Sequence, residues 1–175
     1  TQARKCGGQD IKNKQRKASL SAKEKSYCGD CIFVDAATGY IEVENQSFLS
    51  AEETIQAVEA FELKSLDHGI MIQEYRSDNG TAFTSKAFKE NLAQKDQTTE
   101  YSGSGSHHQN GKAERAIRTV MAMARTMMLH TSIHWGELQD STLWPLAVRH
   151  AVWIYNHVPF LGTGLSPIDT WSKSR

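Results

Sequence analysis

The feature that most constrains the fold is an alternation of strand-like and helix-like segments. The stretch CIFVDAATGYIEVE, residues 31–44, predicts two strands around a turn, because it is rich in Ile, Val, Phe and Tyr. Residues 50–69 predict a helix that opens with a capping box of Ser50 and Glu53 and ends at Gly69. The alternation continues with a strand at 70–77, a helix at 85–95, a strand at 98–101, and helices at 113–130 and 141–156. Such an order is typical of an α/β layer fold, so we predict a mixed sheet flanked by helices.

The beginning of the chain differs from the rest in charge. The whole chain has a formal net charge of zero, yet residues 1–25 hold eight Lys or Arg against two acids. We therefore predict a basic, loop-like segment at 1–27 and a single domain at 28–175. A basic arm can bind phosphates, and a solvated, flexible segment is an equally good interpretation.

The cysteine count argues against a disulfide framework. Cys28 and Cys31 form one C-x-x-C pair and Cys6 is the third cysteine. A zinc site needs two more ligands at suitable spacing, and no second pair follows. Cys31 opens an apolar run, so we expect it to be buried in a strand rather than to bind a metal. The four tryptophans are expected to be core or packing residues, with little to suggest base stacking.

No run of residues is apolar for long enough to cross a membrane, and the N-terminus shows no signal-peptide pattern. We expect a nuclear or cytoplasmic protein that is not secreted.

Asp78 raises the first functional question. It ends the predicted strand at 70–77 and precedes Asn79 and Gly80, a pair typical of turns. The ordinary interpretation is a turn residue whose side chain bonds the local backbone. However, sites in open α/β sheets gather at the carboxyl ends of strands, which makes Asp78 a candidate ligand or catalytic group.

Glu114 is the second candidate acid. It lies in the first turn of the predicted helix at 113–130, after a Gly/Ser-rich loop at 102–111. An acid there suits the positive end of the helix dipole, so that role is the ordinary one. At about 100° per residue, Glu114, Arg118, Met121 and Arg125 share one stripe of the helix. We place the apolar stripe at Ala113, Ile117, Val120, Ala124 and Met127 or Met128.

The two acids lie in the blocks RSDNGTAF and HHQNGKAERAIRTV, and 35 residues separate Asp78 from Glu114. Together these blocks resemble the catalytic core of retroviral and retrotransposon integrases. The resemblance is strongest to the copia type. IFVDAATGYIEV resembles the hairpin of that core, WPLAVRHAVWIYNHVP its following helix, and SPIDTW its closing segment. The match covers about residues 28–172. The ordered set of blocks is specific, whereas either acid block alone would be weak.

The resemblance implies an RNase H-like fold and DNA integration by a polynucleotidyl transferase. Such enzymes cleave the 3′ ends of retroelement DNA and join them to target DNA, using two Mg²⁺ or Mn²⁺ ions held by three acids. By resemblance, Asp78 and Glu114 match the second and third of these acids. Family members also work as oligomers on DNA, so the complete protein is expected to be a homo-oligomer.

The first acid of the family pattern has no counterpart in this sequence. It belongs to a central strand ahead of the hairpin, and Asp10 lies in a polar, glycine-rich stretch instead. Asp35 lies in the hairpin block, where a turn role is the better interpretation. We therefore expect a fragment that lacks its first central strand, with unpaired strand edges beside the gap. Such a fragment should not join DNA strands by itself.

The resemblance also implies a nucleic-acid surface around the start of the long helix. Its members would be Asn110, Gly111, Lys112, Arg115 and Arg118, with Arg125 further along. A solvated helix face is an equally good interpretation of the cations. His107 and His108 could donate to phosphates, although solvated loop histidines explain them as well.

Two alternatives to an integrase stay open. One keeps the fold and changes the reaction, as in an RNase H-like nuclease or a DNA transposase. The other is a non-catalytic module of the same fold that binds nucleic acid or protein. The absent first acid keeps this second alternative open.

Overall fold

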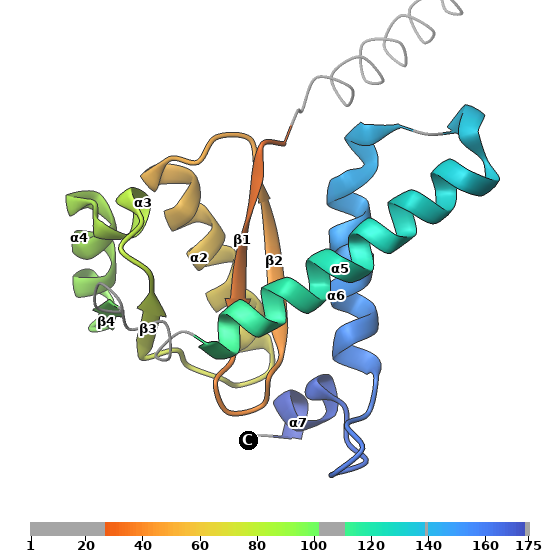
Figure 1. Cartoon of the computed structure of the whole chain (residues 1–175). Helices are drawn as coiled ribbons and strands as arrows, with labels where there is room; N and C mark the ends of the chain where they lie inside the picture. The colour runs from red at the N-terminus through yellow and green to blue at the C-terminus, as the bar shows by residue number, and fades with distance from the viewer. Residues whose placement is uncertain (1–26, 102–110, 139, 174–175) are drawn as a thin grey trace, which may run out of the picture.

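The computed structural model describes residues 27–101, 111–138 and 140–173. Its elements alternate as the sequence predicts, with one added short helix after β3 and another at the end of the chain (Figure 1). The strands and helices are β1 (Gly29–Val34), β2 (Ile41–Gln46), α2 (Ala51–Asp67), β3 (Glu74–Ser77), α3 (Thr81–Thr84), α4 (Lys86–Gln94), β4 (Thr98–Tyr101), α5 (Gly111–His134), α6 (Trp144–His157) and α7 (Pro167–Lys173). Two 3₁₀ turns, η1 (Gly136–Leu138) and η2 (Ser141–Leu143), lie between α5 and α6.

The strands form two separate two-stranded sheets within the described residues. β1 pairs antiparallel with β2, with Ile32 opposite Val43, and β3 pairs parallel with β4, with Tyr75 opposite Thr99. Each of the four strands therefore has one edge without a strand partner in this part of the chain.

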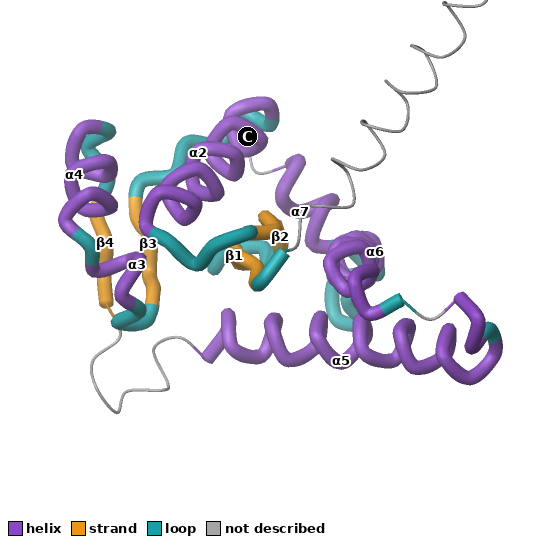
Figure 2. Tube along the Cα trace, turned by 90° about the horizontal axis from the view of Figure 1, so that it is seen from above, coloured by secondary structure: helices purple, strands orange, loops and turns teal. Residues whose placement is uncertain are grey.

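The β1–β2 hairpin is covered on both faces. Alternate residues of a strand point to opposite faces, so Cys31 and Phe33 face α2 while Ile32 and Val34 face α5 and α6. Figure 2 shows α2 on one side of the hairpin and α5 on the other. Burial on both faces explains why β1 is apolar from Cys31 to Val34, whereas in β2 the polar Glu42 and Glu44 alternate with the buried Ile41 and Val43.

One core lies under α2 and joins the two sheets. The Phe33 ring of β1 stacks on Phe61 of α2 at a centroid distance of 4.6 Å and meets the Tyr75 ring of β3 edge-on at 6.4 Å. Phe88 and Leu92 of α4 complete this core, as their spacing on a predicted amphipathic helix requires. The same apolar residues thus hold both sheets to one helix.

A second core packs α5 and α6 against the hairpin. It contains Ile41 and Val43 of β2, Ala116, Val120 and Ala124 of α5, and Val148, Ala151 and Val152 of α6. The small alanines allow the two helices to approach each other closely. Asn156 of α6 is buried here, and its amide accepts from Ile41 N at 3.0 Å and donates to Ile41 O at 2.7 Å.

Several sequence predictions are confirmed at the level of single residues. Cys31 is buried in β1, and burial raises the pKa of its thiol to about 12. Asp35 has the expected turn role, because its Oδ2 accepts from Thr38 N and Thr38 Oγ1, both at 2.6 Å. The Ser50 hydroxyl caps α2 by accepting from Glu53 N at 3.2 Å.

Other predictions were wrong in their details. Glu53 accepts from Ser47 N and Phe48 N instead of completing the capping box. β3 begins at Glu74 rather than at residue 70. On α5 the apolar stripe includes Ala116, whereas Ile117 is 39% exposed.

All four tryptophans pack against other side chains, as expected, but they differ in burial. Trp171 is buried against Tyr40, and Trp144 is half-buried beside the second core. Trp135 and Trp153 lie at the surface. Among the described residues, no helix is long and apolar enough to cross a membrane.

Candidate functional site

The first candidate acid, Asp78, follows β3 directly. Its side chain is exposed, and its Oδ1 accepts from Gly80 N at 3.1 Å. This bond is the turn role that Asn-Gly after an acid predicts. A Cβ at Gly80 would lie 3.0 Å from Asp78 Oδ1 and 3.4 Å from the Phe83 ring, so a glycine lets the turn close around the carboxylate. The turn fixes one oxygen of Asp78, and within the described ranges no hydrogen bond or ion pair reaches the other.

The second candidate acid, Glu114, lies in the first turn of α5 and is exposed. The positive end of the helix dipole favours a carboxylate at this position. The C-terminal end of β3 and the N-terminal end of α5 both lie on the side of the molecule opposite α2 (Figure 2). The element that precedes Asp78 therefore ends on the same side of the molecule as the helix that carries Glu114 begins.

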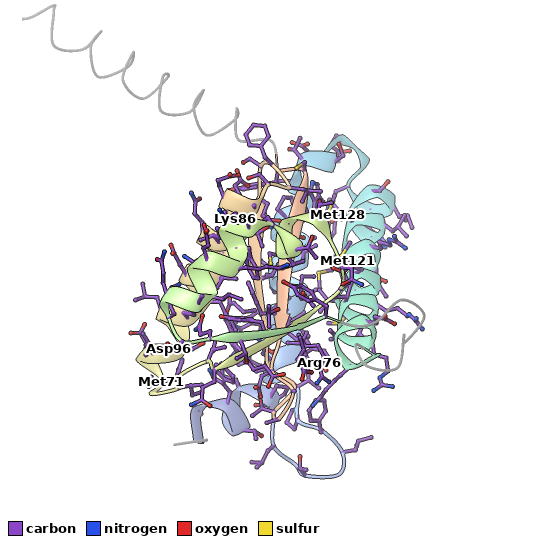
Figure 3. The ribbon with its side chains drawn as sticks, turned by 90° about the vertical axis from the view of Figure 1, so that its left-hand side faces the viewer. Met71, Arg76, Lys86, Asp96, Met121 and Met128 are labelled. Atoms are coloured by element: carbon purple, nitrogen blue, oxygen red, sulfur yellow. The ribbon has the colours of Figure 1, made fainter. Side chains whose placement is uncertain are left out.

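Glu114 begins a shallow, open hollow of about 420 Å³ along one face of α5, called here the α5 groove. The lining residues are Glu114, Ile117, Arg118, Met121, Ala122 and Arg125. The stripe predicted from helical spacing is thereby confirmed, since Arg118, Met121 and Arg125 share the groove with Glu114. Met121 also packs against the second core, and Figure 3 shows it on α5 beside the strands. The groove combines an acid and two guanidinium groups with apolar side chains.

Sequence reasoning did not identify Ile117 as a lining residue, because periodicity placed it in the apolar stripe. Its 39% exposure puts it in the groove instead. The signal in the sequence was its position three residues after Glu114 and four before Met121, the neighbour spacings on a helix surface.

The remaining predicted nucleic-acid residues are placed differently from one another. Lys112 Nζ donates to the backbone oxygen of Ala36, so this lysine ties the start of α5 to the β1–β2 turn. Arg115 is exposed but does not line the groove, because it lies about 100° round the helix from Glu114. Gly111 is the first residue of α5, and Asn110, His107 and His108 lie outside the described residues. Of these predicted nucleic-acid-binding cations, Arg118 is thus the one that lines the same groove as Glu114.

The donor set around the two acids fits a hard cation only in part. Carboxylate oxygens suit Mg²⁺ or Mn²⁺, and Mg²⁺ is commonly bound by one or two carboxylates with waters in the remaining positions. Within residues 27–101, 111–138 and 140–173, no group of three or more His, Cys, Asp or Glu side chains is placed to hold a metal. Asp78 and Glu114 therefore supply oxygen donors without a third acid from this part of the chain.

No protein-family model matches the sequence. Among solved structures, the HTLV-2 integrase catalytic core domain in complex with magnesium, in its trimeric form, matches with a TM-score of 0.59 and 20% identity over 81% of this chain and 82% of that chain. The catalytic core domain of BIV integrase matches with a TM-score of 0.58 and 17% identity, over 82% of this chain and 84% of that one. A chain of the simian T-cell lymphotropic virus intasome in complex with PP2A regulatory subunit B56 gamma matches with a TM-score of 0.64 and 16% identity. The match covers 82% of this chain but only 48% of that one, so this chain spans about half its length. The fold is therefore that of retroviral integrase catalytic cores, a mixed α/β fold of the RNase H-like class.

Proposed function

We propose that this chain is the catalytic core of a copia-type retrotransposon integrase, a polynucleotidyl transferase that acts on DNA. One observation carries the proposal: in an integrase-like fold, an exposed acid follows the end of β3 and another lies in the first turn of α5, and these two element ends lie on the same side of the molecule. The copia assignment rests on the sequence blocks around Asp78 and Glu114. The domain would occupy residues 28–175 of this sequence, after the basic segment at 1–27.

Asp78 and Glu114 are the residues that would hold Mg²⁺ or Mn²⁺. When bound, two such ions activate an attacking oxygen and stabilise the leaving oxygen at a phosphodiester. The chain's own contribution is to position the two carboxylates. The Gly80 N–H fixes the orientation of Asp78, and the first turn of α5 fixes Glu114.

Arg118 and Arg125 would hold the DNA backbone in the α5 groove. A guanidinium group matches the geometry of phosphate oxygens and positions DNA without reading its sequence. Lys112 has a structural part in the proposal, because its ammonium group already bonds Ala36. We expect Arg115 to contribute less than Arg118, since it does not line the groove.

Full activity needs a third carboxylate, which the described residues do not place beside these two. We therefore expect the 175-residue chain by itself not to join DNA strands. A longer protein that adds an acid on a strand between β1 and β3 should be active. In that protein we also expect self-association, as the trimeric and dimeric forms of the HTLV-2 core show for that relative, and a nuclear or cytoplasmic location.

The decisive test measures end cleavage and strand transfer by the longer protein on retroelement-end DNA with Mg²⁺. Asp78→Asn and Glu114→Gln should each abolish both reactions. Asp67→Asn is the matched control, because it removes an exposed acid at the end of α2, away from the site. Full activity in either site variant would overturn the assignment of that residue. Cleavage without strand transfer in the unaltered protein would favour a nuclease, and transfer of transposon ends a DNA transposase.

A second candidate function is a non-catalytic nucleic-acid-binding module. It is favoured by the lack of a three-acid cluster in the described residues and by the two arginines of the groove. Arg118→Ala should reduce the slope of log K against log salt by about 0.9 if this residue contacts one phosphate. Arg149→Ala, an exposed arginine on α6, is the control that should leave the slope unchanged. Unaltered binding in Arg118→Ala would remove the groove from both candidate functions.

A further inference from the structure

We propose that His130 and His134 form a two-imidazole binding site for a transition-metal ion such as Zn²⁺, Ni²⁺ or Cu²⁺. Both residues belong to the last two turns of α5, four positions apart, which puts them on the same helix face. Their ring centroids are 4.3 Å apart, with an interplanar angle of 42°. This site is independent of the proposed integrase function.

The ring separation is close to the one that chelation requires. With metal–nitrogen bonds of about 2.1 Å and an angle of roughly 90–109° at the metal, the two ring centroids lie roughly 4.5–5.2 Å apart. The rings of His130 and His134 therefore need to separate by less than about 1 Å, which a small side-chain rotation supplies. The helix backbone would not have to change.

The two imidazoles are also accessible to an ion. Both side chains are exposed, and no hydrogen bond or ion pair to either ring is found in the described part of the chain. Trp135 contacts both rings, at centroid distances of 5.7 Å from His130 and 5.8 Å from His134. These contacts restrict the rings before an ion arrives, which reduces the entropy lost on binding.

The ligand type separates this site from the candidate acids. Imidazole nitrogen suits Zn²⁺, Ni²⁺ and Cu²⁺, whereas carboxylate oxygen suits Mg²⁺ and Mn²⁺. Glu114 and His130 are 16 residues apart on one helix, a separation of about 24 Å at 1.5 Å per residue. In Figure 1 the C-terminal end of α5 projects beyond α6, away from the sheets. Since no third protein ligand joins the pair within the described residues, water would fill the other positions.

The chain contains a matched pair of histidines that should not chelate. His150 and His157 of α6 are seven residues apart, and Trp153 stacks against both rings, at 6.1 and 4.3 Å. His157 Nδ1 also lies 2.7 Å from the backbone oxygen of Trp153. This pair has the same residue types and a similar aromatic neighbour, without two imidazoles in contact.

The test is calorimetric titration of the untagged chain with NiCl₂ and, separately, with ZnCl₂. Loss of an outer-shell partner typically weakens metal binding about 10- to 100-fold, so His130→Ala or His134→Ala, which removes a direct ligand, should weaken it at least tenfold. His150→Ala and His157→Ala should leave the affinity unchanged. Circular dichroism would verify that the exposed substitutions leave the fold intact.

Fluorescence gives a second readout that locates the ion. Bound Ni²⁺ or Cu²⁺ should quench the emission of Trp135, so Trp135→Phe should remove the saturable quenching while binding by calorimetry persists. Equal affinity of the unaltered chain and His130→Ala would overturn the proposal. Equal weakening by His150→Ala would also overturn it, because the pair on α5 would then have no special role.

Discussion

The two sheets have the same number of strands but are held in the molecule by different forces. In the β1–β2 sheet, Cys31, Phe33, Ile41 and Val43 are all buried, and helices cover both faces. In the β3–β4 sheet no strand residue is fully buried. The first sheet is therefore stabilised mainly by the burial of apolar side chains. The second sheet buries fewer such side chains, so this contribution is much smaller there.

Polar contacts to α2 contribute more to the stability of the β3–β4 sheet than to that of the β1–β2 sheet. The carboxylate of Glu62 accepts from Tyr75 Oη at 3.0 Å, from Lys95 Nζ at 2.8 Å and from Gln97 Nε2 at 2.9 Å. Gln97 also donates to the backbone oxygen of Ile72. Glu62 thus connects the helix to β3 and to the turn before β4.

This difference bears on the candidate site, because Asp78 follows β3 and Glu114 begins a helix that packs on the other sheet. Segments with few buried apolar contacts open at lower free energy than well-buried ones. We infer that the position of Asp78 depends on a less stable unit than that of Glu114.

The largest expected effect comes from truncating the core of the first sheet. Ile41→Ala should lower the free energy of unfolding by about 2–5 kcal/mol, because Ile41 is fully buried between β1, α5 and α6. Ile72→Ala, just ahead of β3, should cost about 1–2 kcal/mol, since Ile72 is only half-buried. Urea denaturation measures both values. Equal costs would remove the distinction between the sheets.

The next effect tests a buried polar contact of the first sheet. Asn156→Ala should cost about 2–4 kcal/mol, because Ile41 N–H and C=O would both lose their buried partner. Asn91→Ala is the control from the other half. Its amide donates to Glu59 at the surface, at 3.2 Å, and its loss should cost about 1 kcal/mol or less. A cost at Asn156 as small as at Asn91 would contradict the pairing with β2.

A smaller effect is expected from breaking the polar attachment of β3–β4. Glu62→Ala should cost about 1.5–3 kcal/mol, since three donors lose a charged acceptor that is mostly shielded from water. Glu59→Ala removes an acid of the same helix that is half exposed and 3.7 Å from Lys95, so its cost should stay below about 0.5 kcal/mol. Hydrogen exchange should then speed up at Tyr75 and Thr99 amides more than at β1–β2 amides. Uniform acceleration would indicate that the two sheets open together.

Alkaline pH should lower the stability of both regions, the one around β1–β2 through the ionisation of Tyr40 and the one around β3–β4 through that of Tyr75. Burial, followed by the charge of Glu62, raises the pKa of Tyr75, and burial with Glu42 raises the pKa of Tyr40. Each raised pKa contributes stability that is present below the ordinary tyrosine value of about 10 and is lost as pH rises above it, because the unfolded chain ionises first. The slope should be at most about 1.4 kcal/mol per pH unit per tyrosine.

Denaturation curves between pH 9 and 11 measure this slope. Tyr75→Phe and Tyr40→Phe should each flatten it relative to the unaltered chain. An unchanged slope in both site variants would show that neither tyrosine resists ionisation in the folded chain.

Local patterns in the sequence were sufficient for most elements. The alternation at residues 41–44 predicted β2, and Phe88 and Leu92 predicted the buried face of α4. The position of Asp78 at a strand end also followed from the apolar run before its turn. These features depend on neighbours within a few residues, which a sequence displays directly.

Features that depend on distant neighbours could not be obtained in the same way. Helical periodicity fixes a stripe only to within about one residue, so Ala116 and Ile117 exchanged their expected places. Trp135 and Trp153 show that residue type alone does not establish burial. The contact of Lys112 with Ala36 joins residues 76 positions apart, and no local pattern indicates it.

The contact between Asn156 and Ile41 also has a consequence for the order of folding. It joins residues 115 positions apart, whereas the hairpin and α2 form from neighbours in the sequence. Contacts between distant residues require a large loop to close, so they form late and slow the reaction. We expect β1, β2 and α2 to associate first and α6 to dock last. During synthesis, the apolar face of β2 would therefore stay exposed until residue 156 has left the ribosome, and this interval is when the chain is most prone to aggregate.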